Sequence, residues 1–157
     1  MLRKLLVIGL VLASLGFAQG GRGNRGGGDT SGGGMMVAPP SKFENISNAL
    51  NLNKDQRKAV RTVLDEAAKE ATPLRDQLSK ARIAIADAIQ AKKSDDEITQ
   101  GVNAYAALAI QMSTLEINTF AKIYAGLDET QKANRNGIGT VFAMMKNLFA
   151  TRNWNED

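Results

Sequence analysis

An unbroken heptad pattern of apolar residues between residues 60 and 88 is the feature that most constrains the fold of this chain. Its members are spaced alternately four and three residues apart: Val60, Leu64, Ala67, Ala71, Leu74, Leu78, Ala81, Ile85 and Ala88. Such spacing places one stripe of side chains along a helix that packs lengthwise against another helix. Pro73 lies inside the pattern without shifting its phase, and a proline within a helix bends the axis. The pattern therefore predicts one kinked helix over residues 54–91 rather than two separate helices.

A second long helix is expected after a short turn at residues 91–93. Ser94 and Glu97 have the spacing of a capping box, in which each side chain accepts a hydrogen bond from the other residue's backbone N–H. Apolar residues then recur at helical spacing as far as Ile123, and Gly126 suits a helix end. Because the turn is short and the two helices are similar in length, the sequence predicts a long antiparallel helical hairpin.

Two shorter helices are expected to flank the hairpin, which makes the fold class all-α. The first covers residues 41–50. The last covers residues 129–149, although Gly137 and Gly139 should each weaken it by about 1 kcal/mol relative to alanine. The helical domain is thus predicted to span residues 41–149 and to be followed by a polar tail, residues 150–157, in which no role is assigned to Trp154.

The N-terminal residues have the order of a secretory signal peptide, with Arg3 and Lys4 before an apolar run over residues 5–12 and small residues ending at Ala18. The apolar run is shorter than the about 20 residues of a membrane-spanning helix, and no cysteine follows that could carry a lipid anchor. Residues 19–40 are glycine-rich and are expected to form a flexible linker. The sequence therefore predicts cleavage of residues 1–18, a periplasmic location and no stable membrane anchor after cleavage.

Composition argues against several kinds of function. Removal of the signal peptide leaves 18 basic and 16 acidic residues, too even a balance for a nucleic-acid partner. The chain has no histidine and no cysteine, which are common metal ligands, and histidine is also the commonest general base. The adjacent acids Asp95, Asp96 and Glu97 occupy a first helical turn, where the helix dipole alone favours negative charge. We therefore expect no catalytic residues, no metal site, no cofactor and no enzymatic activity.

One short motif occurs twice, at the start of the predicted hairpin and again after it. Each copy has a leucine, then a residue suited to capping a helix, two polar residues and a glutamine. The capping residue and the glutamine can form a capping box, and the leucine before them can pack on the first turn. The copies are Leu52-Asn53-Lys54-Asp55-Gln56 and Leu127-Asp128-Glu129-Thr130-Gln131.

Two such motifs around a long helical hairpin, behind a signal peptide, resemble the Spy/CpxP family of periplasmic stress proteins, which is marked by paired LTxxQ motifs. Here the copies read LNKDQ and LDETQ, so Asn53 and Asp128 stand where the family has threonine. Both substitutions preserve the capacity to cap a helix. The resemblance covers residues 43–149 and leaves out the glycine-rich linker.

The resemblance implies a homodimer shaped as a curved cradle that binds unfolded or misfolded envelope proteins without ATP in a stress response. It also implies an alternative, in which the protein regulates an envelope-stress or metal-responsive sensor by binding the periplasmic domain of a sensor kinase. Metal-linked relatives bind zinc, nickel or cobalt largely through histidines, which this chain lacks. A purely structural coiled-coil module remains a third possibility.

A cradle that holds clients weakly needs cationic and apolar surface, and a basic stripe runs along the first long helix. Arg57, Arg61, Arg75 and Arg82 are the candidate client-binding residues on this stripe. The alternative interpretation is a solvated flank whose arginines pair with nearby aspartates and glutamates.

Overall fold

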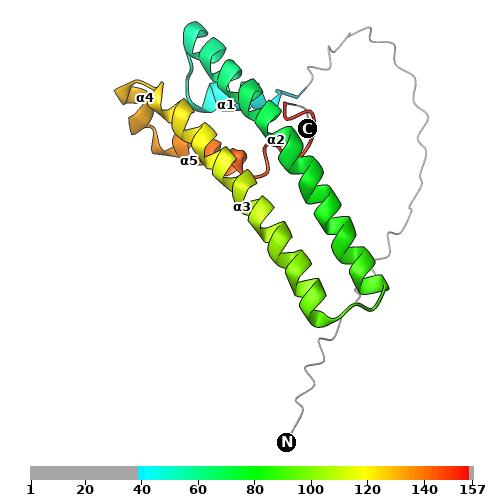
Figure 1. Ribbon diagram of the computed structural model, residues 1–157. Helices are drawn as coiled ribbons and strands as arrows, with labels where there is room; N and C mark the ends of the chain where they lie inside the picture. The colour runs from blue at the N-terminus through cyan, green and yellow to red at the C-terminus, as the bar shows by residue number, and fades with distance from the viewer. Residues whose placement is uncertain (1–38, 156–157) are drawn as a thin grey trace, which may run out of the picture. The chain divides into compact units, whose positions relative to one another are not determined.

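The computed structural model describes residues 39–155, and all regular structure in this part of the chain is helical. In chain order the helices are α1 (Lys42–Ala49), α2 (Lys54–Gln90), α3 (Asp95–Ala125), α4 (Glu129–Ala133) and α5 (Arg135–Met145). Helices α2 and α3 pack along each other as an antiparallel hairpin, with α1, α4 and α5 at one end (Figure 1). The predicted all-α hairpin fold is therefore confirmed. The predicted signal peptide and most of the predicted linker lie outside the described residues.

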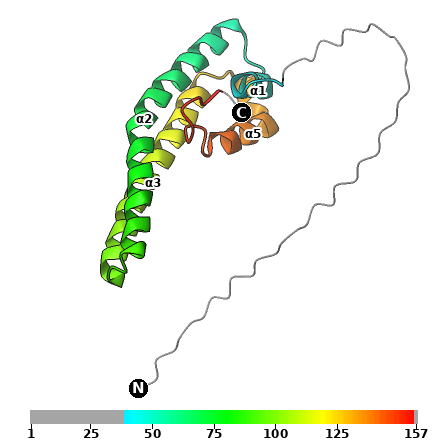
Figure 2. The same cartoon turned by 90° about the vertical axis from the view of Figure 1, so that its right-hand side faces the viewer.

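Helix α2 runs without a break through Pro73, as the phase of the heptad pattern predicted. Its axis bends along its length (Figure 2), which is the expected effect of a proline that cannot donate to the preceding turn. The capping box of Ser94 and Glu97 at the start of α3 is formed, with both reciprocal hydrogen bonds present. None of the helices in the described residues is long and apolar enough to cross a membrane.

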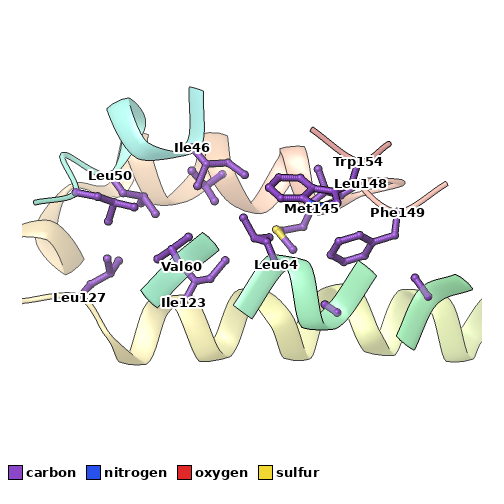
Figure 3. Close-up of a cluster of buried hydrophobic side chains, with 14 of the residues drawn as sticks. Ile46, Leu50, Val60, Leu64, Ile123, Leu127, Met145, Leu148, Phe149 and Trp154 are labelled. Carbon is purple, nitrogen blue, oxygen red and sulfur yellow. The ribbon is translucent and has the colours of Figure 1, made fainter. Parts of the chain in front are cut away.

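The hairpin has two halves that differ in packing. We call residues 41–71 and 112–155 the head, and residues 72–111 the arm. The head contains every buried side chain of the described residues, whereas no residue of the arm is buried. In the head, α1, α5 and the C-terminal segment form a third layer over α2 and α3, and large apolar side chains from all of them meet (Figure 3). Those labelled in Figure 3 are Ile46, Leu50, Val60, Leu64, Ile123, Leu127, Met145, Leu148, Phe149 and Trp154.

The predicted last helix differs from the structure, which divides it into α4 and α5 and ends it at Met145 rather than residue 149. Asn134 separates the two pieces, because its side chain accepts a hydrogen bond from the Gly137 N–H at 3.0 Å and so caps α5. The same side chain donates to the Ala49 carbonyl oxygen at 3.2 Å, which ties α5 to the end of α1. A Cβ atom at Gly137 would collide with this carbonyl oxygen. Gly137 is therefore required for packing rather than being only a weak point.

Residues 146–155 form a non-helical segment that we call the C-terminal strap. It begins with a sharp change of direction at Asn147, whose φ of 62° is in the left-handed region. Leu148, Phe149 and Trp154 of the strap are buried in the head, with exposed fractions of 2 %, 0 % and 5 %. The residues predicted as a polar tail thus include a core tryptophan, because the indole supplies apolar area that the small head can bury.

Candidate functional site

The two copies of the repeated motif lie against each other in the head. Both capping boxes are formed, by Asn53 with Gln56 and by Asp128 with Gln131. The two glutamine side chains also exchange hydrogen bonds with each other. Gln56 Nε2 donates to Gln131 Oε1 at 2.8 Å, and Gln131 Nε2 donates to Gln56 Oε1 at 2.9 Å. A motif that looks like a local helix start is therefore also a long-range joint between the two ends of the hairpin.

Neighbouring backbone groups complete this glutamine joint. Gln56 Nε2 also donates to the Gly126 carbonyl oxygen at 3.2 Å, and Gln131 Nε2 also donates to the Asn51 carbonyl oxygen at 3.0 Å. The leucines that precede the caps, Leu52 and Leu127, are each 5 % exposed and belong to the core. Each glutamine amide uses both its donor hydrogens and its oxygen within the protein, so the joint has no free group for a ligand.

Two arginines of the predicted client-binding stripe make contacts within the head. Arg57 donates to the Leu52 carbonyl oxygen and to Asn48 Oδ1, both at 3.2 Å. Arg61 pairs with Asp65 at 3.2 Å, as the alternative interpretation of a solvated flank describes. Its guanidinium also lies 5.3 Å from the ring centres of both Phe43 and Trp154, and such contacts between cations and aromatic rings are attractive. These two side chains help to hold the N-terminal helix and the C-terminal strap on the hairpin.

The other two arginines lie beside the strap. Arg75 Nη1 donates to the carbonyl oxygens of Phe149 at 2.9 Å and Thr151 at 3.0 Å, and Nη2 donates to Thr72 Oγ1 at 3.1 Å. Arg82 has no hydrogen bond or ion pair to any described residue. Of the four predicted residues, Arg82 is thus the one whose guanidinium has no partner among residues 39–155, and a client-binding role for the stripe stays a prediction.

Sequence analysis missed Glu116, the only charged residue between Glu97 and Lys122 of α3. Its side chain is buried between α3 and the strap, with an exposed fraction of 6 %. Burial raises the pKa of the Glu116 carboxyl above its ordinary value, while hydrogen bonding from the backbone amides of Asn147, Phe149 and Leu148 opposes that rise. The sequence did contain a signal for this residue, since Glu116 is a single glutamate in an otherwise uncharged stretch of helix. A carboxylate in such surroundings usually needs a specific partner.

The arm exposes large apolar side chains on both helices. Ile83 and Ile89 of α2 are 59 % and 56 % exposed, and Val102 and Ile110 of α3 are 46 % and 66 % exposed. On α3 they border an open groove of about 580 Å³ that extends over small residues of the same helix. Its lining consists of Val102, Tyr105, Ala106, Ala109, Ile110, Ser113, Thr114 and Ile117. Exposed apolar surface of this kind is typical of sites that bind another protein.

One comparison with known proteins gives a match. A family model described as heavy-metal resistance matches residues 4–134, which include the whole hairpin and both copies of the motif. No curated protein and no solved structure matches the chain.

Proposed function

The chain belongs to the heavy-metal resistance family, and we propose that within it the protein is an ATP-independent periplasmic chaperone of the Spy/CpxP type. The family is related to Spy/CpxP-like helical periplasmic proteins, which supports this assignment. In this proposal the protein holds unfolded or misfolded envelope proteins under stress, and metal stress is one condition that produces them.

The residues of this chain do not fit a heavy-metal site of its own. The sequence contains no histidine and no cysteine, the ligands that bind such metals best. Within residues 39–155 no three acidic side chains come together as a cluster that could hold an ion. A contribution to metal resistance through protection of other proteins is therefore favoured over sequestration of the metal.

The exposed apolar surface of the arm is the observation that carries the chaperone proposal. Ile83 and Ile89 are each more than half exposed, and cationic Lys80 and Arg82 lie on the same stretch of α2. Unfolded chains expose apolar side chains and charges together, so such a mixed surface can hold them weakly through both kinds of contact.

The other helix of the arm is suited to a second copy of this chain. From residue 98 to residue 121, α3 has one charged side chain, Glu116, and that one is buried in the head. Interface cores are depleted in charge, and small residues such as Ala106 and Ala109 allow a second helix to approach closely. In the head the α3 surface beside Glu116 is covered by α5, whose Phe142 contacts Phe120 with ring centres 5.0 Å apart. We propose that in the arm the partner subunit's α3 takes the corresponding place, which makes the protein a homodimer.

The chaperone proposal is tested with protein that begins at residue 19, by light scattering of a reduced, unfolding client without ATP. We expect suppression at a few-fold molar ratio and a clear loss in the double variant Ile83→Gln/Ile89→Gln. The matched control, Ala59→Gln/Thr62→Gln, alters exposed positions of α2 in the head and should behave as wild type. If folded, helical protein gives no suppression, the chaperone proposal fails. The alternative, a regulatory partner of a sensor, would then take its place.

The dimer is tested by cross-linking, for which a chain without cysteine is well suited. Ala109 lies near the middle of the α3 groove, so Ala109→Cys should form an intermolecular disulfide across a two-fold axis. Ala86→Cys, on an exposed face of α2, should not. Light scattering coupled to gel filtration should give twice the monomer mass, and a monomer at micromolar concentration would contradict the proposal.

A further inference from the structure

A second cavity lies between the hairpin and the C-terminal strap, at the boundary of head and arm. This strap pocket has a volume of about 340 Å³. Arg75 and Arg82 of α2 and Glu116 of α3 supply its charged groups, and Leu78 and Met112 supply apolar surface. A volume near 300 Å³, apolar walls and a few convergent polar groups are typical of a small binding site.

Two buried polar atoms beside this pocket have no partner. One is Oε1 of Glu116, whose side chain is more than nine-tenths buried; the strap amides lie near this carboxyl, but none of them bonds to Oε1. The other is Nε of Arg75. The Nη atoms of Arg75 are already bonded to the strap, so the guanidinium is fixed in orientation. Buried polar atoms without a partner are costly and rare, and these two supply one acceptor and one donor at the same pocket. A bound group that donates to Glu116 and accepts from Arg75 would satisfy both.

Arg82 adds a second recognition element at the other end of the pocket. It lies seven residues from Arg75 on the same helix, which corresponds to about 10 Å along the axis. Its guanidinium has no partner among the described residues, and an arginine fork binds a carboxylate through two parallel hydrogen bonds. The pocket therefore offers the unpaired guanidinium of Arg82 in addition to the free donor of Arg75 and the free acceptor of Glu116.

A peptide group has the required chemistry, because it presents one N–H donor and one carbonyl acceptor. About three residues of extended chain span about 10 Å, so a peptide bound near Glu116 can place a side chain at Arg82. We propose that the strap pocket binds a short extended peptide segment that carries an acidic side chain. The backbone N–H of the segment meets Glu116, its carbonyl meets Arg75 and its carboxylate meets Arg82. This inference rests on the proposed function and names the client feature that is recognised.

Binding of short labelled peptides to protein that begins at residue 19, followed by fluorescence anisotropy, tests the proposal. One probe is an acetylated pentapeptide with a central aspartate flanked by leucines, and the second has asparagine in place of the aspartate. Wild type should bind the aspartate peptide about tenfold more tightly, since hydrogen bonds to a charged acceptor are the stronger ones. Arg82→Gln should remove this preference, and Lys58→Gln, an exposed cation of α2 in the head and outside the pocket, should keep it. Glu116→Gln should weaken both peptides.

Equal binding of the two peptides by wild type, or a preference that survives Arg82→Gln, would overturn the proposal. No binding of either peptide at millimolar concentration would also overturn it and would leave ordered water as the occupant that satisfies Glu116 and Arg75. Circular dichroism of each variant separates a lost site from a lost fold. The light-scattering assay of client aggregation separates the two proposals. If the protein prefers the aspartate peptide but does not protect clients, only the chaperone proposal is wrong. If the protein protects clients but has no preference between the peptides, only the strap-pocket proposal is wrong.

Discussion

The head and the arm are built from the same two helices and the same heptad pattern, yet only the head has a core. Along α2, Leu64 is fully buried, whereas Leu78, in the same kind of seam position, is only partly buried. The difference is the third layer of α1, α5 and the strap, which covers the hairpin in the head and reaches only the end of the arm nearest the head, where Arg75 donates to the strap. A heptad seam is thus sufficient to pair two helices, but a two-helix layer cannot exclude water from its own contact surface.

The two helices of the arm also differ from each other, in the number of charged residues that they carry. Helix α2 carries five charged residues between Thr72 and Gln90, as expected for a helix in contact with water. Helix α3 carries none between Ile98 and Gln111. The composition of α2 is therefore adapted to solvent and weak contacts, and that of α3 to a partner that covers it.

Removal of one leucine from each half gives the largest expected effect. Leu64→Ala leaves a cavity in the head and should lower the free energy of unfolding by about 2–5 kcal/mol. Leu78→Ala removes the same atoms from a partly exposed site in the arm and should cost about 1 kcal/mol. Urea unfolding followed by circular dichroism measures both. If the two variants lose equal unfolding free energy at high protein concentration and unequal amounts on dilution, a second copy covers the arm at high concentration. If the two losses are equal at all concentrations, the division into head and arm is wrong.

The two glycines of α5 test how tightly the third layer is attached. Gly137→Ala places a Cβ against the Ala49 carbonyl oxygen and should destabilise the head by about 1–3 kcal/mol, since the layers must move apart. A Cβ at Gly139 meets no atom within 4 Å. Gly139→Ala should therefore stabilise the protein by about 0.5–1 kcal/mol through helix propensity alone. Thermal unfolding of the pair measures the contrast, and stabilisation by Gly137→Ala would refute the close packing of α5 on α1.

The hairpin could be predicted from sequence because its causes are local. Heptad spacing, the Ser94 capping box and Gly126 each act within a few residues. The third layer could not, because Asn134 ends one helix and caps the next, and Trp154 becomes a core residue only when the strap folds back onto Asp65 and Arg61. The repeated motif was predicted to cap helices, which is confirmed, but no local rule shows that its two glutamines bond to each other across 75 residues.

The glutamine joint should be energetically coupled across the chain. Gln56→Ala and Gln131→Ala each remove hydrogen bonds in a partly buried site, and their effects should not add, with a coupling energy of about 1 kcal/mol. The control cycle combines Gln131→Ala with Gln100→Ala, an exposed arm residue, and should be additive. Additivity in the Gln56 cycle as well would mean that each glutamine acts only as a cap of its own helix.

The smallest expected effect concerns the pH dependence of the head. Burial raises the pKa of Glu116 in the folded protein above its value in the unfolded chain, so the neutral form favours folding. The stabilising contribution of this group is therefore complete at pH below the unfolded pKa and is lost as pH rises through the folded pKa.

Glu116→Gln keeps the shape without the charge, so the difference in unfolding free energy between variant and wild type should grow over this pH range and then level off. Urea titrations between pH 4 and pH 8 measure this difference. A difference that shrinks with rising pH would mean that the backbone amides of the strap outweigh burial, and that ionised Glu116 holds the strap on the head.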